Sequence, residues 1–207
     1  MPCLHIVDTV AAVFTALGTV GVALFAIYGD WFKDRLVGPR LSVSFFDPKG
    51  DQTFYGSGAK AYFYHLKVKN KSGRSAARGT RVVIRGISQR TPSGQFVQLP
   101  VVYPLQLAWS PSELGETERI VLDESTCDFG RVREFEQVFQ PVIMLVPNNF
   151  KGVVRKGECF RYEVLAIGQN VLSPLPTVFE VSWDGHWTTN QEEMQRHLII
   201  REVKGLT

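Results

Sequence analysis

The sequence has little that would support a disulfide scaffold or a recognisable catalytic chemistry. Its 207 residues include three cysteines, Cys3, Cys127 and Cys159, an odd number without paired spacing. Such usage favours a reducing compartment, although a Cys127–Cys159 bond stays open if the chain faces an oxidising one. Residues 56–60 lack the spacing of a phosphate-binding loop and precede a strand pattern rather than a helix. We therefore expect no cofactor and no enzymatic activity.

Charged side chains are absent from residues 9–29. At ~1.5 Å per residue a helix of this length covers about 30 Å, close to the thickness of the hydrocarbon layer of a bilayer. The sequence therefore predicts a transmembrane helix over residues 9–29, between a short flank at 1–8 and a connector at 30–40. Because the flank has no Lys or Arg and bulky residues end the apolar run, we expect an uncleaved anchor rather than a signal peptide.

The residues that follow this segment predict a membrane interface. Aromatic rings and long basic side chains, which suit the headgroup layer, gather at Tyr28, Trp31, Phe32, Lys33, Arg35 and Arg40. Because basic flanks resist translocation, we expect an inner-membrane, single-pass protein with its soluble part in the cytoplasm. Small residues recur every four positions at Ala11, Thr15, Thr19 and Ala23. This pattern allows helix–helix self-association, or it reflects only the abundance of small residues in membrane helices.

The remainder, residues 41–207, has the pattern of one β-domain. Alternating or β-branched runs such as Leu41–Phe45, Phe63–Val68 and Arg81–Arg85 are bounded by turn residues. Further candidate strands lie at 96–99, 105–109, 118–122, 142–146, 159–167, 177–183 and 198–203. We therefore predict an antiparallel, immunoglobulin-like β-sandwich. A short helical segment is expected over residues 191–197, capped by Thr188 or Thr189.

Two segments carry a resemblance to known proteins. Residues 68–82, a strand, a polar turn and a second strand, look like the corresponding part of immunoglobulin-like adhesion and surface domains. Together with the leading apolar segment and residues 27–31, the chain resembles bacterial single-pass membrane-anchored proteins of unknown function that carry such a sandwich. The resemblance implies a fold and a mode of anchoring, and it implies no catalytic residues.

Charge is segregated along the chain, although the net charge is only +3. Residues 52–112 contain no Asp or Glu, whereas residues 113–136 are mainly acidic. The candidate basic face consists of Lys67, Lys69, Lys71, Arg74 and Arg78. Such a face fits anionic lipid, an acidic protein or the chain's own acidic stretch, or it is simply a solvated face of the sheet. Nucleic acid is disfavoured as a partner because the sequence has no recognisable binding motif.

A cluster of titratable residues in the last quarter of the sequence is a candidate metal site. It comprises Asp184, His186, Glu193 and His197, with Glu193 and His197 on one helical face. A metal site would need three or four of these groups to converge. The alternative is a tight turn at Asp184–Gly185, with Glu193 paired to His197 on the surface. His65 stands alone between Tyr64 and Leu66 and is interpreted as a structural histidine.

These features predict a membrane-anchored, non-enzymatic binding or scaffolding module that presents a β-sandwich at the cytoplasmic membrane surface. Its expected partners are membrane lipid and an unidentified protein. Two alternatives stay open. One is an envelope-facing adhesion or assembly subunit with inverted topology, and the other is a metal-dependent enzyme that uses the Asp/His/Glu cluster.

Overall fold

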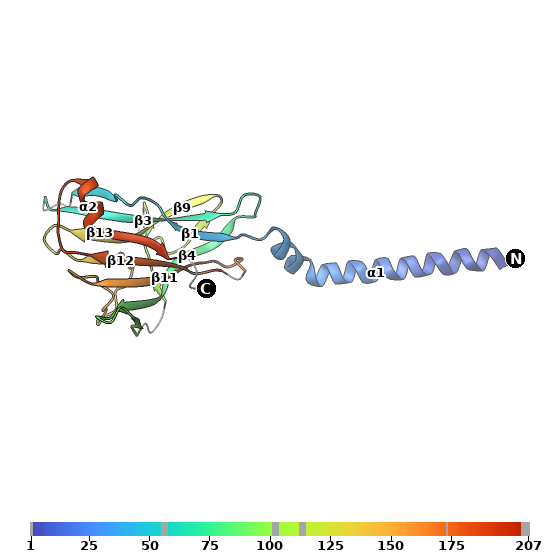
Figure 1. The fold of residues 1–207 in the computed structure, drawn as a ribbon. Coiled ribbons are helices and arrows are strands. Elements are labelled where there is room, and N and C mark those ends of the chain that lie inside the picture. Colours follow the sequence, from blue (N-terminus) through green and yellow to red (C-terminus); the bar gives the residue numbers. More distant parts are fainter. Residues whose placement is uncertain (1, 55–57, 101–103, 112–114, 173, 204–207) are drawn as a thin grey trace. The chain divides into compact units, whose positions relative to one another are not determined.

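The computed structural model describes residues 2–54, 58–100, 104–111, 115–172 and 174–203, with the backbone alone for residues 2–12 and 30–34. The chain divides into two compact units, Met1–Gly38 and Pro39–Thr207. The first unit consists of helix α1 (Pro2–Val37), and the second contains the strands and helix α2 (Gln191–His197) (Figure 1).

Helix α1 does not meet the expectation of a transmembrane segment. In the part of the chain that the structure describes, no helix is both long and apolar enough to cross a membrane. The predicted transmembrane helix over residues 9–29 is therefore wrong. That prediction rested on the absence of charge, whereas Thr15, Gly18, Thr19 and Gly21 contribute little apolar surface to the described part of the helix.

The second unit is built from two antiparallel sheets. Within the described residues, six strands form the first sheet, in which β1, β3, β9 and β10 follow one another, β2 joins β3 and β7 joins β9. These strands are β1 (Leu41–Phe45), β2 (Asp51–Phe54), β3 (Lys60–Asn70), β7 (Trp109–Ser110), β9 (Glu124–Arg133) and β10 (Phe139–Pro141).

The second sheet has seven strands in the described residues, in the order β13, β12, β11, β4 and β5, with β6 and β8 also paired to β4. These are β4 (Ala77–Arg90), β5 (Phe96–Gln98), β6 (Leu105–Gln106), β8 (Arg119–Val121), β11 (Cys159–Ile167), β12 (Thr177–Trp183) and β13 (Leu198–Val203). Strand β4 is the longest and lies beside β11 over most of its length.

The two sheets pack face to face around one aromatic core. The Phe129 ring of β9 lies 5.5 Å from the Tyr162 ring of β11 and 5.4 Å from the Phe179 ring of β12, between ring centroids. All three side chains are fully buried. Burial of such rings is a major stabilising contribution in a sandwich. The predicted mainly β, antiparallel architecture is confirmed, whereas its immunoglobulin-like detail stays a prediction.

Some local predictions are wrong. Residues 142–146 form no strand, and β9, the neighbour of β3 in the first sheet, was not predicted. Helix α2 has the predicted bounds, but its cap is Asn190 rather than a threonine. The Asn190 side chain accepts hydrogen bonds from the backbone N–H groups of Glu192 at 3.0 Å and Glu193 at 3.3 Å.

Candidate functional site

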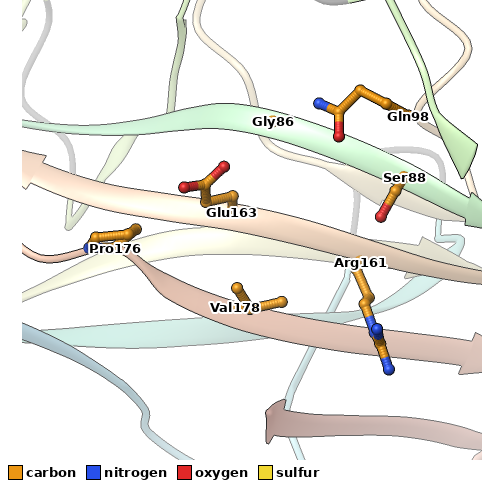
Figure 2. Close-up of a pocket in the computed structure, with 7 residues that line it drawn as sticks. All are labelled: Gly86, Ser88, Gln98, Arg161, Glu163, Pro176 and Val178. Atoms are coloured by element: carbon orange, nitrogen blue, oxygen red, sulfur yellow. The ribbon is translucent and has the colours of Figure 1, made fainter. Parts of the chain in front are cut away.

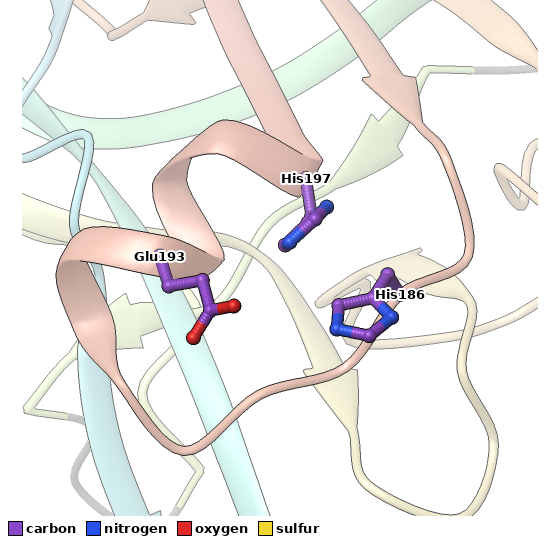
Figure 3. A group of neighbouring side chains, drawn as sticks. All are labelled: His186, Glu193 and His197. Atoms are coloured by element: carbon purple, nitrogen blue, oxygen red, sulfur yellow. The ribbon is translucent and has the colours of Figure 1, made fainter.

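The predicted metal ligands come together at one end of the sandwich. His186 lies in the loop after β12, whereas Glu193 and His197 belong to α2. One ligand atom from each of the three residues lies within 4.8 Å of those of the other two. Figure 3 shows the two imidazoles and the carboxylate turned toward a common space. The ring centroids of His186 and His197 are 4.4 Å apart.

The carboxylate of Asp184 contacts two of these three residues, His186 and His197. One oxygen, Oδ2, lies 2.7 Å from Nδ1 of His197, and the other accepts a hydrogen bond from the backbone N–H of His186 at 2.8 Å. Burial alone would raise the pKa of Asp184, but these hydrogen bonds and the nearby histidines lower it. The predicted turn at Asp184–Gly185 is present, with Gly185 at φ 87°. The expected Glu193–His197 pair is replaced by an Asp184–His197 pair.

Helix α2 is fixed to the sandwich by apolar and polar contacts. Met194 is fully buried, and the Trp187 ring packs against Tyr62 with 5.2 Å between centroids. The side-chain amide of Gln191 donates to the carbonyl oxygen of Gly50 at 3.2 Å, whereas the ion pair between Lys49 and Glu192 is exposed and contributes little. The backbone that carries Glu193 and His197 is therefore held against the first sheet.

The candidate basic face is partly neutralised by the chain itself. Lys67 and Lys69 point outward from β3, and both approach Glu124 of β9, at 3.3 and 3.9 Å. Arg81 of β4 similarly lies 3.7 Å from Glu118. Pairing of β3 with β9 and of β4 with β8 thus brings these basic side chains close to Glu124 on β9 and to Glu118 just before β8. Part of the charge segregation in the sequence is explained by these internal pairs.

Two buried or half-buried asparagines gather three loops at the end of the sandwich opposite α2. Asn70 accepts a hydrogen bond from the backbone of Arg40 and donates to the carbonyl oxygens of Ser75 and Leu122, at 2.8 to 3.1 Å. Asn170 bonds the backbone of Ala76 and Arg78 at 2.9 and 3.0 Å. The loops after β3, after β8 and after β11 are therefore neighbours.

We call this region the basic end. It presents five cations, Arg40, Lys69, Lys71, Arg74 and Arg78, and three exposed leucines, Leu122, Leu172 and Leu175. Two carboxylates of the same loops and strand ends, Asp123 and Glu124, oppose them. Strand β3 ends at Asn70, so Lys71 lies in the following turn rather than on the strand face that the sequence predicted. Positive charge and apolar surface are both accessible here.

A shallow pocket surrounds His65 on the first sheet. It is lined by Asp51, Thr53, Phe54, Phe63, His65, Ser110 and Asp128. Nδ1 of His65 lies 2.8 Å from Asp128, and Nε2 lies 3.0 Å from Asp51. Because a carboxylate occupies each ring nitrogen, neither nitrogen is available to take a proton from Ser110. His65 is a paired structural histidine, which agrees with the interpretation of the sequence.

A second pocket lies on the outer face of the other sheet, lined by Gly86, Ser88, Gln98, Arg161, Glu163, Pro176 and Val178 (Figure 2). Figure 2 shows the side chains of Arg161 and Glu163 directed to different sides. Arg161 bonds Glu180 at 2.9 Å, and Glu163 pairs with Arg85 at 2.5 Å. Arg161 and Glu163 are therefore engaged in ion pairs with neighbouring strands and do not converge on a common ligand position.

Among the predicted interfacial residues, Arg40 belongs to the basic end described above. Tyr28, Arg35 and Arg40 are exposed, and the side chains of Trp31, Phe32 and Lys33 lie outside the described residues. Their predicted interfacial role depended on a span over residues 9–29 and loses that basis. Helix self-association through Ala11, Thr15, Thr19 and Ala23 stays a prediction.

The two cysteines of the sandwich are free. Cys127 lies on β9 of the first sheet and Cys159 on β11 of the second, and both are buried. Burial raises the pKa of both thiols, with nearby carboxylates adding to the effect. Arginines near each thiol oppose this increase, Arg119 at Cys127 and Arg90, Arg161 and Arg201 at Cys159, but burial outweighs them. The bond that the sequence left open between Cys127 and Cys159 is not formed.

Comparison of the chain with models of protein families, with curated proteins and with solved structures found no match.

Proposed function

We propose that the β-sandwich is a non-enzymatic binding module that docks on an anionic lipid surface through its basic end. The observation that carries this proposal is the gathering of five cations and three exposed leucines on loops that Asn70 and Asn170 tie together. Cations attract anionic headgroups, and leucines next to them can enter the boundary between headgroups and acyl chains. The proposed place of action is the cytoplasmic face of a membrane, whose leaflet carries the negative surface potential.

Lipid is favoured over an acidic protein by the mixture of side chains. The exposed leucines belong to separate loops of the basic end, with Leu122 at 67% and Leu175 at 73% exposure. Each basic residue near an anionic surface contributes about 1 kcal/mol. Five cations opposed by two carboxylates thus support a binding energy of about 3 kcal/mol before the leucines contribute.

The arrangement of the remaining polar groups supports a binding role. His65 has both nitrogens occupied by carboxylates, and the charges of the outer pocket on the second sheet are used in cross-strand pairs. Burial raises the pKa of both thiols. An envelope-facing subunit with inverted topology would gain from a Cys127–Cys159 bond, and the positions of the two thiols in different sheets give that alternative no support.

Vesicle sedimentation of the full chain tests the proposal. Vesicles of phosphatidylcholine alone are compared with vesicles that also contain about one third phosphatidylserine. We expect binding to the serine-lipid vesicles to exceed binding to the neutral ones at least tenfold. Because the attraction is electrostatic, this excess should largely disappear at 0.5 M NaCl, where charges are screened within a few ångströms. Equal binding to both vesicles at low salt would contradict the proposal.

A further inference from the structure

The end of the sandwich opposite the basic end carries a second constellation, independent of lipid docking. Two imidazoles and one carboxylate, from His186, His197 and Glu193, face one another there with their ligand atoms within 4.8 Å (Figure 3). Ligand atoms about 2.1 Å from one zinc ion in tetrahedral geometry lie about 3.4 Å apart. A decrease of at most about 1.4 Å in the separation of the ligand atoms brings them from 4.8 Å to that spacing.

We propose that His186, Glu193 and His197 bind a divalent transition-metal ion of the zinc type. Imidazole nitrogens combined with one carboxylate suit zinc, copper, nickel and cobalt, whereas magnesium and calcium prefer oxygen ligands alone. Three protein ligands leave a fourth coordination position for water or for a side chain of a partner. His186 and Glu193 are exposed and His197 is half-buried, so this fourth position faces solvent.

The surroundings of the three side chains already have the form of a second coordination shell. The Asp184 carboxylate lies 2.7 Å from Nδ1 of His197, which directs the ring to carry its proton there and leaves Nε2 for a metal. Thr188 donates its hydroxyl hydrogen to Oε2 of Glu193 at 3.0 Å, leaving Oε1 for a metal. Asp184 also fixes the backbone of His186. Asp184 is thus a positioning residue for two of the three proposed ligands.

The backbone segments that carry the three proposed ligands are attached to the sandwich. Asn190 caps α2, Met194 anchors the helix in the core, and Trp187 packs on Tyr62 between His186 and the helix. Because the loop and the helix are both attached to the sandwich, little chain entropy would be lost on metal binding. This is the property that separates the cluster from a chance grouping of surface side chains.

Titration of the purified, metal-stripped full chain with ZnCl₂ by calorimetry, and with CoCl₂ by visible absorption, tests the proposal. We expect saturable binding of one ion per chain and a cobalt spectrum of low coordination number. His186→Ala and Glu193→Gln should each weaken zinc binding at least tenfold. The matched control Glu192→Gln alters the neighbouring carboxylate of the same helix, which pairs with Lys49, and should bind zinc like the wild type.

Asp184→Asn tests the positioning role separately. It should weaken zinc binding about tenfold and shift the cobalt absorption bands while the fold stays intact by circular dichroism. Zinc should also raise the unfolding temperature of the wild type and of Glu192→Gln, but not of His186→Ala. No saturable binding below about 0.1 mM zinc, or binding unchanged in both His186→Ala and Glu193→Gln, would overturn the proposal. Vesicle binding is not affected by either result, so the two proposals fail independently.

Discussion

Nδ1 of His65 on β3 lies 2.8 Å from a carboxylate oxygen of Asp128, the residue directly opposite it on β9. A register shift between Tyr64 and His65 brings the two residues into this position. The hydrogen bond to Asp128 is the main cause that raises the pKa of His65; burial opposes it, and the charges of Asp128 and Asp51 add to the increase. Protonated His65 therefore links the two central strands of the first sheet.

This pair makes stability depend on pH in a defined direction. Because the pKa of His65 is higher in the folded than in the unfolded chain, its stabilising contribution is complete below about pH 6.5 and is lost as the pH rises through the folded-state pKa. We expect the free energy of unfolding to fall in urea titrations as the pH rises above about 6.5. His65→Gln should flatten this decrease, and His186→Gln should retain it. An equal decrease in both variants would contradict the assignment.

Glu180 on β12 forms ion pairs with one arginine on each of the two neighbouring strands. Its carboxylate, 6% exposed, accepts hydrogen bonds from Nε of Arg161 on β11 at 2.9 Å and Nε of Arg201 on β13 at 3.0 Å. Removing the charge leaves two guanidinium groups without their partner, and a hydrogen bond to a charged group contributes about 1.5 to 3 kcal/mol. We expect Glu180→Gln to lower the free energy of unfolding by about 2 kcal/mol.

Glu163 is the matched control for this substitution. It lies on the neighbouring strand β11 and pairs with Arg85, whose side chain is 57% exposed. Exposed pairs contribute little, so Glu163→Gln should cost no more than about 1 kcal/mol in the same urea titration. Similar losses in the two variants would show that the Glu180 pair has no special weight in the second sheet.

Asn70 is expected to determine the shape of the basic end. Its side chain makes three hydrogen bonds to the backbone of three segments and is 6% exposed. Asn70→Ala leaves these groups without their partners, at about 1 to 3 kcal/mol for a buried polar group. We expect unfolding to require about 2 kcal/mol less free energy and binding to serine-lipid vesicles to weaken. Asn149→Ala, in an exposed loop, should change neither, and an undiminished vesicle affinity in Asn70→Ala would contradict the role.

The sequence predicted those strands in which apolar and polar residues alternate clearly. Strands β1, β11, β12 and β13 fall close to their predicted ranges. Strand β9 was not predicted because it has the composition of a charged loop, with Glu124, Asp128, Arg131 and Arg133. In the structure these side chains face outward or pair with neighbours, while Cys127, Phe129 and Val132 enter the core. The register shift at His65 further obscures the period of two.

The candidate sites were predictable to different degrees. Spacing on α2 placed Glu193 near His197, but the approach of His186 depends on the turn at Asp184–Gly185 and on the docking of Trp187. The contributions of Leu122, Leu172 and Leu175 to the basic end carried no sequence signal, because three loops far apart in the chain meet there. The internal pairing of Lys67 and Lys69 with Glu124 likewise requires knowledge of which strands are neighbours.

The most direct test of the docking proposal is a comparison of two charge variants of equal net charge on phosphatidylserine-containing vesicles. Lys71→Gln/Arg78→Gln removes two exposed cations from the basic end, whereas Lys151→Gln/Lys156→Gln removes two exposed cations from loops elsewhere on the sandwich. At about 1 kcal/mol per basic residue, the first variant should bind about 30-fold more weakly than the wild type, and the second should bind within about threefold of it. Equal losses in the two variants would contradict docking through the basic end.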